Sequence, residues 1–282
     1  MEFRNLDRLN ILGKNVLITG SAGLLGKEHA EAILEIGGSL ILTDINLYAL
    51  KIQYEFLKEK YNTEKLLYFV LDITQEREVI KLAEYLIKKH NIVVDILINN
   101  AAVDHKVGLN GFNNTNNNNL EEFSLETWNN ELAVGLTGSF LMSKVFGNLM
   151  YERNNKEGII VNIASDLSVI APKQSLYKSS IDSDKNNFKP IPYSVIKSGL
   201  IGMTKYLATY WAGSNIRCNA LSPGGVINGQ DPEFVAKLSN EIPLGRMASK
   251  NEYRSAIQFL VSEASSYLNG HNLVIDGGRS IW

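Results

Sequence analysis

Short apolar runs alternate along the chain with longer segments in which apolar residues recur at helical spacing. This alternation is typical of repeated β-α-β units, in which helices cover both faces of a parallel sheet. We therefore predict one α/β domain over residues 1–282, with a doubly wound, parallel, seven-stranded sheet. A helix is expected from Leu24 to Ile36, where Gly37 and Gly38 supply a stop signal. The predicted strands are 15–20, 39–44, 66–71, 94–99, 158–164, 215–221 and 271–275.

Two polar stretches, about 103–119 and 172–192, interrupt this rhythm and are predicted to be loops at the rim of a substrate site. The first begins with Asp104, His105 and Lys106, which either face the substrate or are merely solvated. The second contains the insertion 173–189, which carries four lysines and two aspartates. This insertion is either a lid that recognises a polyhydroxylated or anionic substrate, or a solvated loop of mixed charge.

Composition narrows the class of partner. The chain has 28 Lys+Arg against 30 Asp+Glu, so no basic excess favours nucleic acid or a membrane surface, and a small molecule is expected. The single cysteine, Cys218, and an N-terminus without an apolar signal core indicate a cytoplasmic protein. No apolar run approaches a membrane span. A metal site is not predicted, because the four histidines are scattered: His29, His90, His105 and His271.

A glycine-rich turn follows the first predicted strand, from Thr19 to Gly26. Glycines at such a turn let the backbone approach a pyrophosphate, and the following helix directs its free N–H groups at that anion. The strict GxGxxG spacing is absent, so a tight turn with no ligand is the alternative. The residues expected to contact the cofactor here are Gly20, Ser21, Ala22, Gly23, Leu24 and Leu25.

The second predicted strand ends at Asp44, which lies 24 residues after Gly20. Its carboxylate is expected to accept hydrogen bonds from the adenosine ribose of a dinucleotide. The alternative is that Asp44 or Asn46 only caps the next helix. A carboxylate at this place repels a 2′-phosphate, and the turn up to Leu25 has no arginine or lysine to offset it. NAD is therefore predicted in preference to NADP.

Four motifs occur in order along the chain: the glycine-rich turn, the run 99–102 (Asn-Asn-Ala-Ala) after the fourth strand, Ser165 after the fifth, and Tyr193-x-x-x-Lys197. This ordered set resembles the short-chain dehydrogenase/reductase family over essentially the whole chain. Within that family, the run 192–226 looks most like oxidoreductases encoded with flagellin-modification and nonulosonic-acid sugar pathways. The resemblance implies a Rossmann-type fold and a homotetramer or homodimer.

The resemblance also implies further cofactor contacts. Asp72 would bind the adenine edge, the run 99–102 would stabilise the central sheet beside the cofactor, and Pro223 and Gly224 would lie near the nicotinamide. With the residues of the turn and Asp44, the expected cofactor set also contains Ile45, Asp72, Ile73, Asn100, Ala101, Ala102, Tyr193, Lys197, Pro223, Gly224 and Val226.

Tyr193 and Lys197 lie four residues apart in a predicted helix that starts near Pro192, so both side chains emerge on one face. An ammonium about 4 Å from a phenol lowers its pKa by about three units, which makes tyrosine a competent base near neutral pH. Ser165 is expected to hold the reacting oxygen, unless it is a strand-end serine satisfied by backbone. The same Tyr-x-x-x-Lys spacing occurs at three other places, but only this pair follows the fifth strand: Tyr54/Lys58, Tyr61/Lys65 and Tyr85/Lys89.

Three positions depart from the family pattern. Gly135 stands where a fourth catalytic residue, asparagine, is usual, so we expect a proton relay of looser geometry. Leu24 replaces a frequent glycine, and Asn228 stands where a threonine often contacts the nicotinamide amide. Cys218 is predicted to be a core residue. The stripe Leu200, Met203, Leu207 and Trp211 is predicted to be core or a subunit contact.

Together these features predict an NAD-dependent oxidoreductase of carbohydrate metabolism. Hydride would move between the nicotinamide and a secondary alcohol or ketone, with a sugar or sugar derivative as the expected substrate. Tyr193 would be the acid/base, Lys197 would tune it and bind the nicotinamide ribose, and Ser165 would orient the substrate. The alternatives are a lipid or other apolar alcohol as substrate and a non-catalytic NAD(H)-binding sensor or scaffold.

Overall fold

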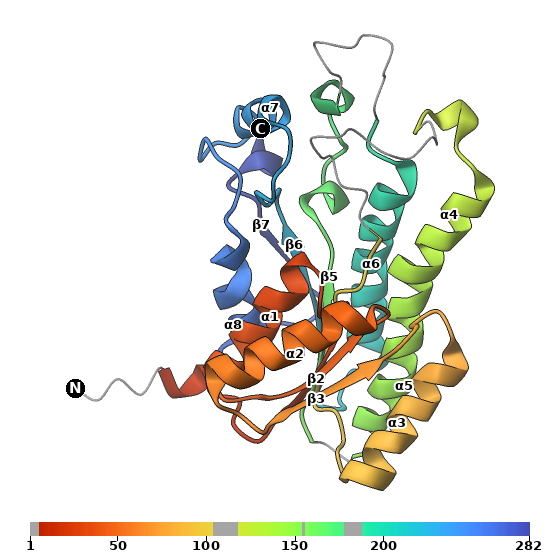
Figure 1. Ribbon diagram of the computed structural model, residues 1–282, viewed down its shortest axis with the longest axis vertical. Coiled ribbons are helices and arrows are strands. Elements are labelled where there is room, and N and C mark those ends of the chain that lie inside the picture. The colour runs from red at the N-terminus through yellow and green to blue at the C-terminus, as the bar shows by residue number, and fades with distance from the viewer. Residues whose placement is uncertain (1–5, 104–117, 154–155, 178–187) are drawn as a thin grey trace.

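Seven parallel strands form one sheet in the order β3-β2-β1-β4-β5-β6-β7, as a computed structural model of the protein shows (Figure 1). The structure describes residues 6–103, 118–153, 156–177 and 188–282. The seven predicted strands are confirmed to within two residues at each end. The strands are β1 Asn15–Thr19, β2 Ser39–Asp44, β3 Leu66–Val70, β4 Ile96–Asn99, β5 Gly158–Ile163, β6 Ile216–Pro223 and β7 Asn272–Ile275.

Helices cover both faces of this sheet, which confirms the doubly wound α/β class. In Figure 1 the helices α1, α2 and α8 lie on one side, and α3, α5 and α6 lie on the other. The predicted first helix is present and ends before Gly37, whose φ of +87° suits glycine. The helices are α1 Leu24–Glu35, α2 Leu47–Tyr61, α3 Glu76–His90, α4 Leu125–Leu132, α5 Ser139–Tyr151, α6 Ile191–Tyr210, α7 Pro232–Ser239 and α8 Arg254–Leu260.

The side chains of each central strand alternate between two apolar cores. Val16 of β1 packs in the core beneath α1, α2 and α8, whereas the next residue, Leu17, packs with Phe146 beneath α3, α5 and α6. Cys218 is buried in the second core, where burial raises the pKa of its thiol to about 12. Leu200, Leu207 and Trp211 are also buried, so the core interpretation of Cys218 and of this stripe is confirmed.

One long helix was not anticipated from the sequence. α4 and α5 are joined by a π-helical segment, Ala133–Gly138, into a continuous helix from Leu125 to Tyr151 that is long and apolar enough to cross a membrane by length and composition alone. The expectation that no run approaches that length is therefore wrong. The reason for its apolar character is internal, since Met142, Phe146 and Met150 pack against the sheet.

The strand order creates the place for a ligand. β1 pairs with β2 on one side and with β4 on the other, so the chain direction across the sheet reverses between β1 and β4. In open α/β sheets, ligands bind at the carboxyl ends of the strands where the order reverses. The glycine-rich turn follows β1, and the Asn-Asn-Ala-Ala run follows β4, at this point of the sheet.

Candidate active site

A cavity of about 780 Å³ lies at the carboxyl edge of the sheet. Its lining combines the turn after β1, the ends of β2, β4, β5 and β6, and the first turns of α6. All three predicted catalytic residues, Ser165, Tyr193 and Lys197, line it. The predicted cofactor residues that line it are Gly20, Ala22, Gly23, Leu24, Leu25, Asp44, Ile45, Asp72, Ile73, Asn100, Ala101, Ala102, Tyr193, Lys197, Pro223, Gly224 and Val226.

Ser21 is the one predicted contact that the structure does not bring to the cavity. Its side chain is fully buried, and its hydroxyl donates to the carbonyl oxygen of Thr43 at 3.2 Å. Its backbone N–H donates to the same carbonyl at 3.0 Å. Ser21 therefore ties the turn after β1 to β2.

The glycine-rich turn has the shape that a pyrophosphate requires. Gly20 has a φ of +59°, and a Cβ there would lie 2.8 Å from the Cα of Ala101. Gly23 is the N-cap of α1 and has no side-chain oxygen over the first N–H groups of the helix. These N–H groups and the positive end of the helix dipole fit the diphosphate of a dinucleotide.

Asn100 fixes the turn from the neighbouring strand. Its Nδ2 donates to the carbonyl oxygens of Thr19 at 3.0 Å and Gly20 at 2.9 Å. One layer deeper, the Nδ2 of Asn99 donates to Asn162 at 2.8 Å and to Ser143 at 2.9 Å. The Asn-Asn pair thus holds β1, β4, β5 and α5 in register beneath the cavity.

At the far end of the cavity from Tyr193, Asp44 is held by two backbone donors. Its Oδ2 accepts the N–H of Ala22 at 3.1 Å, and its Oδ1 accepts the N–H of Asn46 at 3.0 Å. The cap of α2 is Asn46, whose side chain accepts the N–H of Ala49, so Asp44 is not the capping residue. Its carboxylate lines the cavity with acceptor capacity left for ribose hydroxyls.

The cations of the cavity lie at its other end. Among the described lining residues, Lys189, Lys197 and Arg279 are the lysines and arginines. Lys197 is 5% exposed, and its Nζ donates to the carbonyl oxygen of Ile163 at 2.8 Å and lies 5.7 Å from the ring centre of Tyr193. The Nζ of Lys189 lies 3.7 Å from the same ring centre. Both ammonium groups therefore lie beside the ring of Tyr193.

The other tyrosines at the same spacing lack this setting. Tyr61 donates to Glu31 at 2.9 Å, and burial with the nearby carboxylates raises the pKa of Tyr61 above its ordinary value. Tyr85 lies exposed on α3. Tyr193 therefore differs from the tyrosines of the other Tyr-x-x-x-Lys pairs in its location at the carboxyl edge of the sheet.

Ser165 follows β5 and is 4% exposed. Its hydroxyl donates to Oδ1 of Asp166 at 2.8 Å and accepts the N–H of Leu167 at 3.2 Å. The other oxygen of Asp166, Oδ2, forms an ion pair with Nη1 of Arg279 at 2.7 Å. Ser165 is thus held by a carboxylate as well as by backbone, in contrast to the alternative of a serine satisfied by backbone alone.

The position of Gly135 is tightly packed. It lies in the π-helical segment, and a Cβ there would stand 2.6 Å from Cγ2 of Ile196, the residue before Lys197. Its carbonyl oxygen accepts the hydroxyl of Ser139 at 3.1 Å. An asparagine does not fit unless Ile196 moves, and the expected looser geometry of the proton relay stays a prediction.

Sequence reasoning missed part of the lining. Asp166 and Arg279 carry charge into the cavity, and four apolar side chains form a wall above it: Tyr177, Phe234, Leu238 and Met247. The wall is built where residues 174–177 pack on α7. No sequence motif identifies these residues.

Other predicted residues lie outside the described part of the chain, namely Asp104, His105, Lys106 and most of the two predicted rim loops. The described part has no group of His, Cys, Asp or Glu that could hold a metal.

Comparison with known proteins shows the family to which the chain belongs. The sequence model of the family described as "Enoyl-(Acyl carrier protein) reductase" matches residues 20–280. The chain is 33% identical over 290 aligned residues to an NAD-dependent glycerol dehydrogenase of Listeria innocua, with 100% of both chains covered. The chain belongs to the short-chain dehydrogenase/reductase family. The prediction of a nicotinamide-dependent oxidoreductase that acts on alcohol and ketone groups is thereby confirmed, and the non-catalytic alternative has no support.

Two further members of the family show its breadth. A D-threitol dehydrogenase of Mycolicibacterium smegmatis is 30% identical, with 95% of this chain and 94% of its own length covered. A crystal structure of a gluconate 5-dehydrogenase from Burkholderia cenocepacia, in complex with NADP and tartrate, superposes with a TM-score of 0.82 at 26% identity and covers 99% of both chains. The family members similar to this dehydrogenase thus include one named for NAD and one whose structure contains NADP.

Proposed function

We propose that this dehydrogenase oxidises a secondary alcohol of a polyol or sugar derivative with NAD, or reduces the corresponding ketone. One observation carries the proposal: Ser165, Tyr193 and Lys197 line the same cavity as the glycine turn and Asp44. When bound, NAD⁺ accepts the hydride from the substrate carbon. The residues of the chain then have to bind the alcohol and remove its proton.

Each of the three side chains has one task in this proposal. The phenol oxygen of Tyr193 takes the proton of the substrate hydroxyl, or returns it in reduction. Lys197, fixed by the carbonyl oxygen of Ile163, makes that oxygen more acidic and binds the nicotinamide ribose. Ser165 holds the reacting oxygen beside the phenol. The tight packing at Gly135 supports a fixed backbone beside Lys197, without a fourth catalytic side chain.

For the cofactor, we infer a preference for NAD over NADP. Asp44 carries a negative charge where a 2′-phosphate would bind, and the described lysines and arginines of the cavity belong to its opposite end. A ribose diol donates two hydrogen bonds to such a carboxylate, whereas a phosphate is repelled by it.

The substrate class rests on relatives as well as on the site. The glycerol and D-threitol dehydrogenases act, by name, on short polyols. The charged groups Lys189, Asp166 and Arg279 at the substrate end support a hydroxylated substrate over a lipid alcohol. The likeness of residues 192–226 to oxidoreductases of flagellin-modification and nonulosonic-acid pathways remains a prediction, as does the role of the loops at 103–119 and 172–192 as the substrate rim.

We further propose a cytoplasmic homotetramer or homodimer. The outer surfaces of α5 and α6 expose large apolar side chains, among them Phe140, Tyr151, Tyr206 and Tyr210. Tyr206 and Tyr210 stack at 5.9 Å, a rigid apolar surface of the kind that a second copy of the chain covers. Light scattering of the purified protein tests the assembly, and a monomer would contradict it.

The test of function is NADH formation with a panel of polyols, sugars and sugar nucleotides. We expect turnover with at least one polyol, and a loss of about a thousandfold in kcat in Tyr193→Phe, because general acid–base catalysis contributes on that order. Tyr85→Phe is the matched control, since Tyr85 has the same spacing to a lysine but lies exposed on α3. Unchanged turnover in Tyr193→Phe, or NADH binding without turnover on any substrate, would overturn the proposal.

A further inference from the structure

The ion pair beside Ser165 combines burial with access to the cavity. The side chains of Asp166 and Arg279 are 5% and 7% exposed, yet both residues line the cavity. Withdrawing two charges from water costs free energy that their attraction only partly offsets. The pair joins the segment after β7 to the end of β5, and its position in the cavity lining directs attention to what its remaining polar atoms do.

Asp166 uses both of its oxygens. Oδ1 accepts from the hydroxyl of Ser165 and from the N–H of Leu167, each at 2.8 Å, and Oδ2 accepts from Arg279. The carboxylate accepts the hydrogen of Ser165, so the serine donates to a reacting oxygen once its hydrogen turns from Asp166 to that oxygen. Asp166 therefore sets the resting rotamer of Ser165.

Arg279 has donors to spare. A guanidinium carries five N–H donors, and among the described residues Asp166 is the partner of one nitrogen, Nη1. The other two nitrogens have no partner among the described residues and are not fully buried, and Arg279 lines the cavity. These donors are available to a substrate oxygen.

Ser165 and Arg279 stand on opposite oxygens of one carboxylate. Two neighbouring hydroxyl groups of a polyol present two oxygens side by side, so one hydroxyl can meet Ser165 while the next accepts from Arg279. The pair Asp166–Arg279 has no net charge, which matches a neutral hydroxyl better than a carboxylate.

We infer that Arg279 binds the hydroxyl adjacent to the reacting carbon and that Asp166 positions Ser165, so that the enzyme selects vicinal diols. The inference rests on the proposed function and goes beyond it, because it assigns the recognition of the second hydroxyl to a residue 113 positions from Asp166 in the sequence.

The experiment compares alcohols that differ only in the neighbouring hydroxyls: glycerol against 2-propanol, and D-threitol against 2-butanol. Arg279→Lys keeps the charge opposite Asp166 but loses the planar fork of donors. We expect its kcat/KM for the polyols to fall about 10- to 100-fold, mainly through KM, since hydrogen bonds to charged groups contribute that much. Its kcat/KM for the simple alcohols should hardly change.

The variant Asp166→Asn is expected to change the kinetic constants in a different way from Arg279→Lys. It should lower kcat for polyols and simple alcohols alike, because it acts through Ser165 on the reacting oxygen. The double variant with Asp166→Asn and Arg279→Gln leaves no unpaired buried charge, and its melting temperature shows whether folding is intact. Arg153→Lys is the control, since Arg153 forms a half-buried ion pair with Asp95 at 2.6 Å away from the cavity lining.

The outcomes separate the two levels of inference. Equal losses for polyols and simple alcohols in Arg279→Lys, at an unchanged melting temperature, would show a structural ion pair only. If the kcat/KM of the unmodified enzyme is no higher for vicinal diols than for simple alcohols, the diol assignment fails, but the proposed dehydrogenase activity stands. Absence of turnover on every alcohol would overturn both.

Discussion

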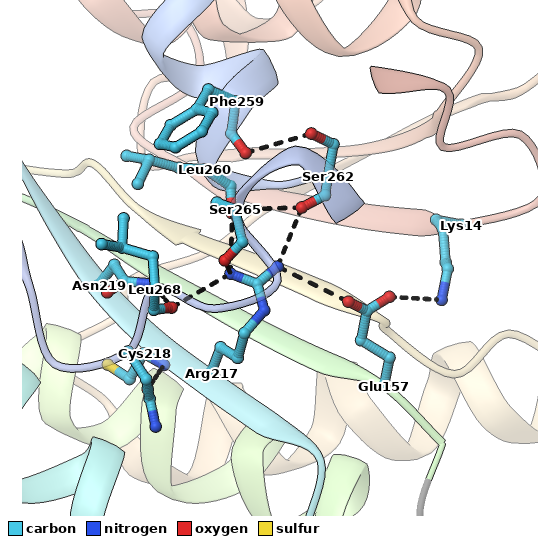
Figure 2. Close-up of polar contacts among 11 residues, drawn as sticks. Lys14, Glu157, Arg217, Cys218, Asn219, Phe259, Leu260, Ser262, Ser265 and Leu268 are labelled. Atoms are coloured by element: carbon cyan, nitrogen blue, oxygen red, sulfur yellow. Dashed lines mark hydrogen bonds and ion pairs between the residues drawn. The ribbon is translucent and has the colours of Figure 1, made fainter. Parts of the chain in front are cut away.

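Two arginines of this protein are equally buried and differ in what their donors meet. Arg217 and Arg279 are each 7% exposed. Arg217, near the start of β6, donates to the carbonyl oxygens of Ser262, Ser265 and Leu268 and to the hydroxyl of Ser265. It also pairs with Glu157 at 3.6 Å, as Figure 2 shows. Arg279 has one partner, Asp166, among the described residues.

The two arginines differ in how many of their N–H donors are bound by acceptors of the protein itself. At the amino edge of the sheet, the carbonyl oxygens around Arg217 tie the segment between α8 and β7 to β6. At the carboxyl edge, the guanidinium of Arg279 reaches a cavity with donors unused. A buried charge surrounded by its own backbone serves folding, whereas one that keeps donors toward a cavity serves binding.

The largest effect that tests this contrast is expected at the structural arginine. Arg217→Met should lower the free energy of unfolding by about 3 kcal/mol, because it removes four hydrogen bonds to Ser262, Ser265 and Leu268 and one of the two cations at Glu157. Denaturant unfolding measures the loss, and KM for alcohol and for NAD should stay unchanged in the folded fraction.

Lys14→Met is the control for Arg217→Met. Lys14 reaches the same Glu157 at 3.2 Å but is about one-third exposed, so its loss should cost about 1 kcal/mol or less. A stability of Arg217→Met equal to that of the unmodified enzyme would remove the distinction between the two arginines.

A second effect concerns a buried polar side chain outside the cavity lining. His29 lies fully buried on α1, its two ring nitrogens have no hydrogen-bond partner among the described residues, and burial lowers the pKa of His29 to about 3. The unfolded chain binds a proton there below about pH 6.5 while the folded chain does not, so stability is complete above that pH and falls as the pH drops toward 3. Between pH 7 and pH 5 the loss should be about 2 kcal/mol.

His29→Leu should abolish that part of the pH dependence and leave kcat unchanged, since His29 does not line the cavity. Thermal unfolding at a series of pH values for both proteins measures it. An identical pH dependence in His29→Leu would assign the acid sensitivity to other groups, such as the carboxylates around Arg254.

The fold could be predicted because its strands are buried on both faces. Runs such as 96–98 and 159–161 are continuously apolar, and the sheet places them in its centre. The helix from Leu125 to Tyr151 could not be predicted, because the small residues of its π segment give no regular period. Its packing depends on the contact of Gly135 with Ile196, far along the chain.

The site, like the fold, has one part that the sequence predicts and one part that it does not. The glycine turn, Asp44, Ser165 and the Tyr193–Lys197 pair are local motifs whose order along the chain reveals them. Asp166 and Arg279 are brought together only by the fold, since the C-terminal segment after β7 returns to the end of β5. A pairing of residues so distant leaves no trace in spacing or periodicity.

The smallest effect is expected at the adenosine end, where the protein satisfies a carboxylate only in part. Asp44 accepts from two backbone N–H groups and keeps acceptor capacity toward the cavity, which makes it the acidic counterpart of Arg279. In Asp44→Ala the ratio of kcat/KM for NAD to that for NADP should fall about tenfold, because a charged hydrogen-bond partner of the ribose is lost and the repulsion of a 2′-phosphate disappears. Asp7→Ala, which removes one negative charge outside the cavity lining, should leave the ratio as it was.

If the unmodified enzyme uses both cofactors equally, or the ratio is the same in Asp44→Ala, then the unused acceptors of Asp44 face solvent and not a ribose. In that event unused hydrogen-bonding capacity toward a cavity would be no guide to binding residues in this protein, and the assignment of Arg279 would lose its main support.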